Sequence, residues 1–437
     1  VPENPARNFY EACQTFWFIQ MLLQIESSGH SISAGRFDQY LYPYYKNSID
    51  NGSLTREFAQ EILDCIWVKF NDLNKARDEA SSYGFAGYSL FQNLTAGGQN
   101  AEGIDATNDL SFLCIQASMH TQLPAPSFSV RIWNGTPNEF LIKCAELTRT
   151  GVGLPAYYND EVIIPALMSR GVTLADAREY GIIGCVEPQK PFKTDGWHDA
   201  AFFNMCRPLE LVFSNGVDKG AQISIKTGNV EDMTTFEEFY NAYKAQETYM
   251  IGLMVNAINA IDTAHSERVP LPFLSCMVED CVKEGKTVQE GGAHYNFTGP
   301  QGFGIANMAD TMAELKDTLI HNYGQGLSPK AAKNATQEVV INLAKAGKSV
   351  NESQVADICR MFLTGEQDPT KRKRYEEILD MINELPKYGN DIEEIDMLAR
   401  DVANIYAKEL EKHKNPRGGM FQAGLYPVSA NVPLGEQ

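Results

Sequence analysis

Residues 180–204 read YGIIGCVEPQKPFKTDGWHDAAFFN, and this stretch carries the strongest indications of the fold and chemistry of the chain. A short apolar run leads into Gly184, Cys185 and Glu187, and the proline after Glu187 disfavours a continuing helix or strand. Turn-forming residues follow, and then an apolar segment that we expect to be a helix. The pattern predicts a loop over residues 181–199 that places the cysteine outside regular secondary structure.

Cys185 and Glu187 are close enough in sequence to act together. In an extended segment, side chains at alternate positions point the same way. A neighbouring carboxylate raises the pKa of a thiol, so the pair is a poor source of thiolate. A sulfur that stays neutral and exchanges a hydrogen atom fits better. Two alternatives remain: a core cysteine, or a thiol nucleophile with His30, His198 or His294 as its base.

The composition excludes several classes of partner. The 437 residues contain 37 Lys and Arg against 56 Asp and Glu, so the net charge is −19. This balance is against binding nucleic acid or anionic lipid, and we expect a small neutral or cationic ligand. The hydrophobic fraction of 43% is ample for a sizeable core. The longest apolar stretch, 16–25, is about half the ~20 residues that a membrane-spanning helix needs.

Several familiar site motifs are missing from the sequence. There are nine cysteines but no CxxC, and HExxH, clustered histidines and GxSxG are absent, so we expect no metal site and no hydrolase elbow. The odd cysteine count and the lack of a basic-then-apolar leader indicate a reduced, cytoplasmic compartment.

Helical patterns alternate with short strand patterns, which predicts an α/β fold. A strand is expected over 127–133, where apolar and polar residues alternate, and a strand-like run over 421–429. The expected helices cover residues 5–26, 55–75, 110–119, 138–150, 160–168, 173–180, 234–268, 329–346, 353–363, 368–384 and 392–414.

The stretches 184–189 (GCVEPQ) and 196–204 (GWHDAAFFN) resemble the active-site cysteine loop of the glycyl radical enzymes, the pyruvate formate-lyase-like family. In that family a backbone glycyl radical oxidises a cysteine to a thiyl radical. Six further blocks resemble the family in the same order: VPENPARNFYEA, GHSISAGRFDQYLYPYY, GFAGYSLFQN, PAYYND, GGAHYNFTGPQGFG and PKYGND.

The resemblance implies a fold and a domain organisation. Residues 1–437 would form the central portion of the catalytic domain, which is a ten-stranded α/β barrel of two five-stranded halves surrounded by helices. The cysteine loop, 181–199, would lie inside the barrel. The RVxGY-type radical segment of the family does not occur in the sequence. We therefore expect the N-terminal part and the C-terminal glycyl radical domain to be absent, and this chain alone to be inactive.

Within the family, the chain is most similar to the B12-independent glycerol and 1,2-propanediol dehydratases. The similarity implies a thiyl radical on Cys185, with Glu187 as the base for the C1 hydroxyl. It also implies hydrogen bonds to substrate from His30, Ser31 and Asp199, with Tyr88 as an aromatic wall residue. For His30 a purely structural role is the alternative. Glu187 is alternatively a loop cap, and Asp199 the N-cap of a following helix.

The implied reaction is dehydration of a small diol to an aldehyde. The alternatives are a choline-type C–N lyase, a sulfonate C–S lyase, a formate acetyltransferase-like enzyme, a conventional cysteine acyl transferase or hydrolase, and an inert fragment or binding module. No bound cofactor is expected besides the glycyl radical, which an S-adenosylmethionine iron–sulfur activating enzyme would install. The resemblance also implies a homodimer in the cytoplasm of an anaerobic prokaryote, with a bacterial microcompartment as an alternative setting.

Overall fold

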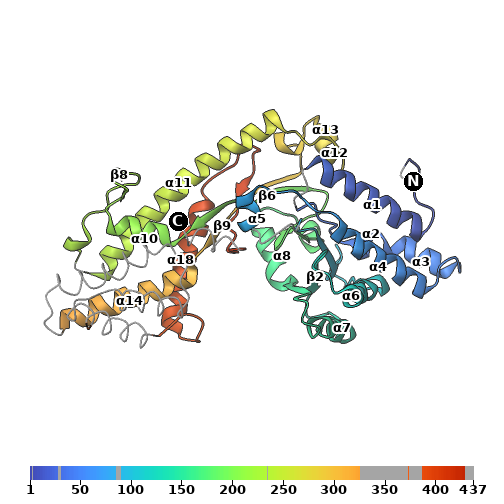
Figure 1. The fold of residues 1–437 in the computed structure, drawn as a ribbon, viewed down its shortest axis with the longest axis horizontal. Coiled ribbons are helices and arrows are strands. Elements are labelled where there is room, and N and C mark those ends of the chain that lie inside the picture. Colours follow the sequence, from blue (N-terminus) through green and yellow to red (C-terminus); the bar gives the residue numbers. More distant parts are fainter. Residues whose placement is uncertain are drawn as a thin grey trace. The chain divides into compact units, whose positions relative to one another are not determined.

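The structure is a computed structural model of the chain, and it describes residues 1, 3–27, 31–84, 90–233, 235–324, 373 and 386–428. The chain divides into two compact units. Unit 1 contains residues 1–82, 87–196 and 263–296, and unit 2 contains 83–86, 197–262 and 297–437. Each unit has a buried hydrophobic cluster of its own. Figure 1 labels the elements of both units.

Unit 1 is built on a parallel sheet. Strands β1 (Asn93–Gly97), β2 (Ser127–Ile132) and β3 (Ala156–Asn159) pair in that order. Helix α6 (Asp109–Thr121) connects β1 to β2, and α7 (Asn138–Thr148) connects β2 to β3, as parallel pairing requires. Every residue of β1 is buried, which is typical of a strand covered on both faces.

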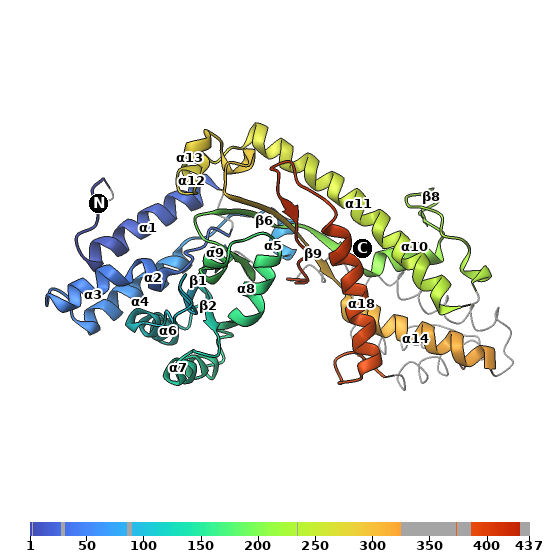
Figure 2. The ribbon, with the colours of Figure 1, turned by 180° about the vertical axis from the view of Figure 1, so that it is seen from behind.

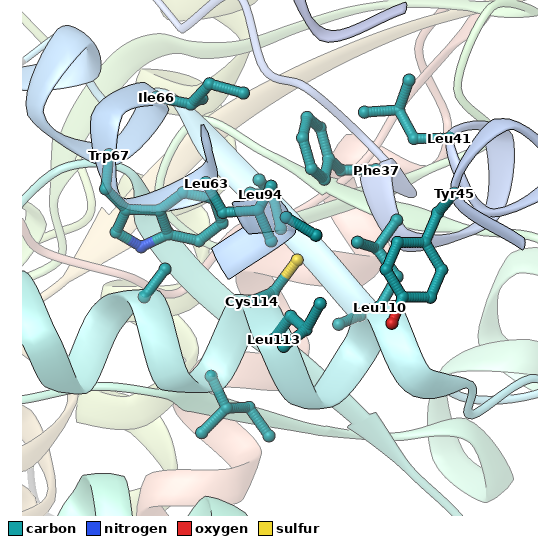
Figure 3. Packing of buried hydrophobic residues seen from close by; sticks show 14 of the residues in the cluster. Phe37, Leu41, Tyr45, Leu63, Ile66, Trp67, Leu94, Leu110, Leu113 and Cys114 are labelled. Carbon is teal, nitrogen blue, oxygen red and sulfur yellow. The ribbon is translucent and has the colours of Figure 1, made fainter. Parts of the chain in front are cut away.

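Helices α2 (Phe37–Tyr40) and α4 (Arg56–Asp72) pack with α6 against this sheet. Figure 3 shows Trp67 and Leu63 of α4 close to Leu94 of β1. The indole Nε1 of Trp67 donates to Ser118 Oγ at 2.8 Å, so the polar atom of this buried ring is satisfied. The result is a core of apolar side chains drawn from helices on one side and β1 on the other.

Polar caps set where the unit 1 helices begin. Asn8 caps α1 (Phe9–Glu26), Thr55 caps α4, and Thr173 caps α9 (Leu174–Arg178), each by accepting a hydrogen bond from a backbone amide of the first turn. The remaining elements of unit 1 are α3 (Tyr42–Asp50), α8 (Asp160–Ser169), α12 (Pro272–Cys276), α13 (Cys281–Glu284) and the 3₁₀ turn η2 (Val288–Glu290).

An antiparallel hairpin of β4 (Gly181–Ile183) and β5 (Glu187–Gln189) follows α9. A buried ion pair holds the backbone just before this hairpin in place. Arg131 of β2 contacts Asp160 at 2.8 Å, and both side chains are fully buried. The same guanidinium donates to the carbonyl oxygens of Arg178 at 2.7 Å and Tyr180 at 2.9 Å. Arg131 therefore ties the central strand of the sheet to the residue before β4.

Unit 2 contains a second three-stranded sheet. Its order is β10 (Met420–Phe421), β9 (Tyr295–Phe303) and β6 (Thr194–Asn204). In Figures 1 and 2 helix α14 (Ile305–Gly324) lies beside α18 (Glu393–Leu410). The remaining elements are α10 (Cys206–Phe213), β7 (Val217–Asp218), β8 (Ala221–Gln222) and the 3₁₀ turn η1 (Val230–Asp232). The chain passes between the units within α5 (Glu79–Gly84), β6, α11 (Phe236–Arg268) and β9.

The predicted α/β class is confirmed, because helices alternate with short strands along the described chain. The predicted barrel is not seen, since the sheets formed by the described residues have three, three, two and two strands and none of them closes. No helix among these residues is both long enough and apolar enough to cross a membrane. The helices expected over 329–346, 353–363 and 368–384 lie outside the described residues, apart from Lys373.

One predicted element is wrong in type. The apolar segment after the cysteine loop is strand β6, whereas the sequence suggested a helix. Its residues pair in the sheet with β9, and Trp197, Phe202 and Phe203 are aromatic residues that strands favour. Tertiary pairing therefore overrides the local pattern. The alternative role of Asp199 as a helix N-cap is wrong for the same reason.

Candidate active site

The cysteine lies in the tight turn of the β4–β5 hairpin. Ile183 pairs with Glu187, so residues 184–186 form the turn. Gly184 has a φ of +61°, a left-handed conformation that strains residues with a Cβ. Cys185 is half-buried, and Glu187 is buried, with 7% of its surface exposed. The expectation of an extended segment is therefore wrong, because the chain reverses between the two side chains.

Glu187 nevertheless folds back onto the turn. Its Oε2 accepts hydrogen bonds from the backbone amides of Cys185 and Val186, each at 3.0 Å. The carboxylate is thus the loop cap considered as an alternative from the sequence. Two amide donors stabilise the negative charge of a carboxylate. Glu187 can therefore cap the loop and still be in the anionic form that a base requires.

Ser31 approaches the same turn from the segment before α2. A Cβ placed on Gly184 would lie 2.9 Å from Glu187 Oε2 and 3.1 Å from Ser31 Oγ. The serine hydroxyl and the carboxylate therefore converge on the residue that precedes Cys185. Ser31 itself has a φ of +57°, and its amide donates to the carbonyl oxygen of Leu90 at 2.8 Å.

Strands of the parallel sheet hold the other side of the turn. The side-chain amide of Asn93, at the start of β1, donates to the carbonyl oxygens of Gly184 at 3.4 Å and Cys185 at 3.5 Å. The hydroxyl of Tyr158 in β3 donates to the Cys185 carbonyl at 3.3 Å. The amides of Cys185 and Val186 thus point toward the carboxylate, and the carbonyls of Gly184 and Cys185 toward the sheet.

Two buried arginines lie in unit 1 near the hairpin entry, and both are engaged. Arg36 donates to the carbonyl oxygen of Gly97 at 3.1 Å. Burial lowers the pKa of Arg36 to about 10, and the positive charge of Arg131 adds to this effect. The ring of Tyr180 lies 3.9 Å from the guanidinium carbon of Arg131, and burial raises the pKa of its hydroxyl. Both guanidinium groups therefore contact other groups of the protein and stabilise the fold.

Asp199 lies on β6 in unit 2 and has a φ of +56°. Burial raises the pKa of its carboxyl, while a hydrogen bond from Gln301 works in the opposite direction. Burial also lowers the pKa of the neighbouring His198 to about 4, and the positive charge of Arg417 contributes. A Cβ on Gly299 would overlap Nδ1 of His198, so the imidazole lies directly against β9. His198 is therefore neutral near pH 7.

The structure brings together three of the predicted site residues, Cys185, Glu187 and Ser31. Asp199 belongs to the other unit, and His30 and Tyr88 lie outside the described residues. The sequence reasoning missed the residues that support the turn. These residues lie within the sequence blocks that resemble the family, and that location was the only indication of them in the sequence. They are Ser33 in GHSISAGR, Asn93 in GFAGYSLFQN and Tyr158 in PAYYND.

The remaining candidate groups are placed as follows. His294, one of the alternative bases, pairs through Nδ1 with Asp280 Oδ2 at 2.7 Å on the surface of unit 1. Across the part of the chain that the structure describes, no three or more His, Cys, Asp or Glu side chains gather as ligands for a metal ion.

Comparison with known proteins shows to which family the sequence is similar. The model of the pyruvate formate lyase-like family matches residues 1–435. The curated (2S)-3-sulfopropanediol dehydratase of Klebsiella oxytoca is 35% identical over 436 residues, which cover 98% of this chain and 48% of that protein.

Two solved structures are similar over nearly the whole chain. One, from work on 1,2-propanediol dehydration in Roseburia inulinivorans, has a TM-score of 0.90 at 61% identity and covers 99% of this chain and 51% of that one. The other is the glycerol-bound B12-independent glycerol dehydratase of Clostridium butyricum, with a TM-score of 0.85 at 51% identity over 99% and 51% of the two chains. The chain therefore spans about half the length of these relatives.

Proposed function

The chain belongs to the pyruvate formate lyase-like family, whose model matches residues 1–435, and on this premise we propose that the complete protein dehydrates a small diol by radical chemistry at Cys185. Membership of the family confirms the resemblance read from the sequence. The proposed substrates are glycerol and 1,2-propanediol, and the products are 3-hydroxypropanal and propanal.

One observation carries the proposal. The Glu187 carboxylate and the Ser31 hydroxyl both converge on Gly184, directly beside Cys185. A hydrogen-atom acceptor, a proton acceptor and a hydroxyl-binding group are what the first step on a diol requires. A neighbouring carboxylate also opposes formation of a thiolate, which favours one-electron over ionic chemistry at this sulfur.

The proposed reaction conserves atoms and electrons. The glycyl radical of the complete protein supplies the oxidation of the Cys185 thiol. The sulfur then takes a hydrogen atom from C1 of the diol, and Glu187 takes the proton of the C1 hydroxyl. The C2 hydroxyl leaves as water with one added proton, which balances the proton that Glu187 removed from the C1 hydroxyl. The resulting C2 radical takes a hydrogen atom back from the Cys185 thiol. The sulfur becomes a thiyl radical again, and the aldehyde is released.

Each further residue has a proposed role in holding the diol. Ser31 would hydrogen-bond a substrate hydroxyl from unit 1. Asp199, His30 and Tyr88 keep the roles expected from the resemblance, as two hydroxyl-binding groups and an aromatic wall. Several convergent polar groups are what an acyclic polyol needs, because each hydroxyl removed from water requires a replacement partner.

The charges favour a neutral diol over a sulfonate. A sulfonate needs a cation that faces the substrate. Arg131 contacts Asp160 and two carbonyl oxygens, and Arg36 donates to Gly97, so both arginines of the neighbouring blocks serve the fold. We therefore rank the neutral diol ahead of the sulfonate alternative.

The proposal extends to the complete protein. We propose that residues 1–437 form the central portion of a ten-stranded barrel with residues 181–199 inside it, and that this chain alone is inactive. An S-adenosylmethionine iron–sulfur enzyme would install the radical. A cytoplasmic homodimer in an anaerobe is the proposed setting.

The test uses the complete protein, activated without oxygen by its activating enzyme. We expect electron paramagnetic resonance to show a glycyl radical, and NMR to show propanal forming from 1,2-propanediol. C185S should keep the glycyl radical and lose turnover. E187Q keeps an oxygen for the two turn amides but cannot accept a proton, so kcat should fall by about 10²–10⁴-fold.

Cys206 provides the matched control, because it is half-buried like Cys185 but contacts Gly304 O through its sulfur at 3.8 Å. C206S should retain activity. Turnover of choline or a hydroxyalkyl sulfonate without turnover of either diol would replace the proposed substrate. Turnover that survives in C185S would remove the radical role of that sulfur.

A further inference from the structure

The hydroxyl of Ser33 joins three segments at the candidate site. Its Oγ accepts hydrogen bonds from the backbone amides of Gly184 at 2.9 Å and Asn93 at 3.0 Å. It donates to the carbonyl oxygen of Ser31 at 3.1 Å. One atom thus links the cysteine turn, the first residue of β1 and a proposed substrate-binding residue.

These bonds use the whole capacity of the group. A serine hydroxyl has one hydrogen to donate and two lone pairs to accept with. All three are engaged at 2.9–3.1 Å, so none remains for water or substrate. Ser33 is therefore built into the support of the site and does not bind the diol.

Two of the three segments that Ser33 joins have positive φ angles. Ser31 has a φ of +57° and Gly184 a φ of +61°. Glycine adopts this conformation without strain, whereas a residue with a Cβ such as Ser31 keeps it only where surrounding contacts hold it. The intervening Ile32 is also fixed, because Gln20 and Gln24 of α1 donate to its carbonyl oxygen at 2.7 Å and 3.0 Å.

We propose that Ser33 is a positioning residue that fixes Ser31 relative to the turn bearing Cys185. This role rests on the proposed diol dehydration. The hydroxyl sets the separation between a hydroxyl-binding serine and the sulfur that takes the hydrogen atom. A small displacement of either group would lengthen the path of hydrogen transfer, which depends steeply on geometry.

Ser33→Ala tests the proposal in the activated complete protein. Removing the hydroxyl leaves the Gly184 and Asn93 amides without an acceptor and the Ser31 carbonyl without a donor. We expect kcat on 1,2-propanediol to fall about tenfold to a hundredfold, with the glycyl radical content unchanged. The deuterium isotope effect with substrate labelled at C1 should rise, because hydrogen transfer becomes slower than product release. Ser33→Thr keeps the hydroxyl and should restore most of kcat.

Ser129 in β2 provides the matched control. It is fully buried in the neighbouring sheet, and its Oγ makes no hydrogen bond to any of the residues that the structure describes. Ser129→Ala should leave kcat, the isotope effect and the radical content unchanged. Hydrogen exchange at the Gly184 and Asn93 amides should quicken in Ser33→Ala and not in Ser129→Ala, which is measurable without any substrate.

The outcomes separate this inference from the proposed function. If the wild-type protein turns over no diol, the function fails whatever the exchange data show. If diol turnover is normal and Ser33→Ala matches Ser129→Ala in kcat and isotope effect, the positioning role is wrong. Loss of the glycyl radical in Ser33→Ala, or a Ser33→Thr variant as impaired as Ser33→Ala, would also overturn it.

Discussion

At the scale of single residues, Gly184 shows how little space the turn allows. Its backbone is left-handed, and the position of a Cβ is already bordered by Glu187 Oε2 and Ser31 Oγ. A glycine meets both demands, since it has no Cβ and adopts positive φ without strain. The proposed acid group and hydroxyl-binding group therefore approach each other because the residue between them has no side chain.

Gly184→Ala should lower kcat on the diol by more than about a hundredfold, because the added Cβ forces Glu187 or Ser31 to move. Gly153→Ala is the matched control, since Gly153 has a φ of +81° but no atom of the described part of the chain lies within 4 Å of its Cβ position. In both variants an alanine must adopt a positive φ, which should cost about 1 kcal/mol or more of folding stability. Thermal unfolding and diol turnover of the complete protein measure the two effects separately. Equal activity in the two variants would contradict the crowding argument.

The sequence was informative about some site residues and silent about others. Cys185 and Glu187 were found because their types and spacing carry chemistry by themselves. Ser33 was missed because a serine is unremarkable in sequence, and its partners Asn93 and Gly184 lie 60 and 151 residues away. Only the folded chain shows that this hydroxyl is shared among three segments.

At the scale of elements, periodicity predicted helices better than strands. The helices now seen as α4, α6 and α7 were expected to within three residues at each end, because caps and apolar spacing are local signals. β1 and β9 were not expected. Their glycines and polar residues obscure the strand pattern, and pairing with distant segments decides their structure.

Helix α11 carries a buried acid that the proposed reaction does not use. Glu247 is fully buried, and the hydroxyl of the buried Tyr243 lies beside its carboxyl. Burial raises its pKa to about 8. The group is therefore mostly a neutral acid in the folded protein near pH 7, in a setting where an isolated negative charge is expensive.

Glu247 should make unit 2 less stable as the pH rises. A carboxyl whose folded pKa lies above its unfolded value contributes stability that is complete below about pH 4.5 and is lost as the pH rises through about 8. The limiting slope is about 1.4 kcal/mol per pH unit. Chemical unfolding of wild type and Glu247→Gln between pH 5 and 8.5, followed by signals from unit 2, measures the difference. The variant should lose less stability over this range.

Glu237 supplies the control, because it is exposed in the first turn of the same helix. Glu237→Gln should keep the wild-type dependence on pH. Parallel stability curves for wild type and Glu247→Gln would mean that Glu247 titrates normally. Buried acids and bases at other positions shift both curves equally, so only the difference between them is diagnostic.

At the scale of the whole molecule, blocks far apart in sequence surround one turn. The segments 29–45, 84–93 and 155–160 supply Ser33, Asn93 and Tyr158 to the hairpin. Their order along the chain was visible in the sequence, but their convergence was not, because it depends on the parallel pairing of β1, β2 and β3. The support of the cysteine turn therefore depends on the unit 1 sheet and on the segment that carries Ser33.

Each unit has its own buried core, which predicts that damage to one core is felt first in that unit. Leu110 on α6 and Leu410 on α18 are both fully buried, in the unit 1 and unit 2 clusters respectively. Leu110→Ala and Leu410→Ala should each lower the free energy of unfolding by about 2–5 kcal/mol. Hydrogen exchange should quicken mainly in the unit that carries the substitution.

The cysteine turn distinguishes the two variants further, because Cys185, Glu187 and Ser31 all belong to unit 1. Local opening exposes groups in proportion to the population of the open state. Alkylation of Cys185 by a neutral reagent should therefore be faster in Leu110→Ala than in Leu410→Ala at the same pH and temperature. Cys206, which belongs to unit 2, should show the reverse order in the same samples. Equal labelling of both cysteines in both variants would mean that the two cores open as one cooperative body.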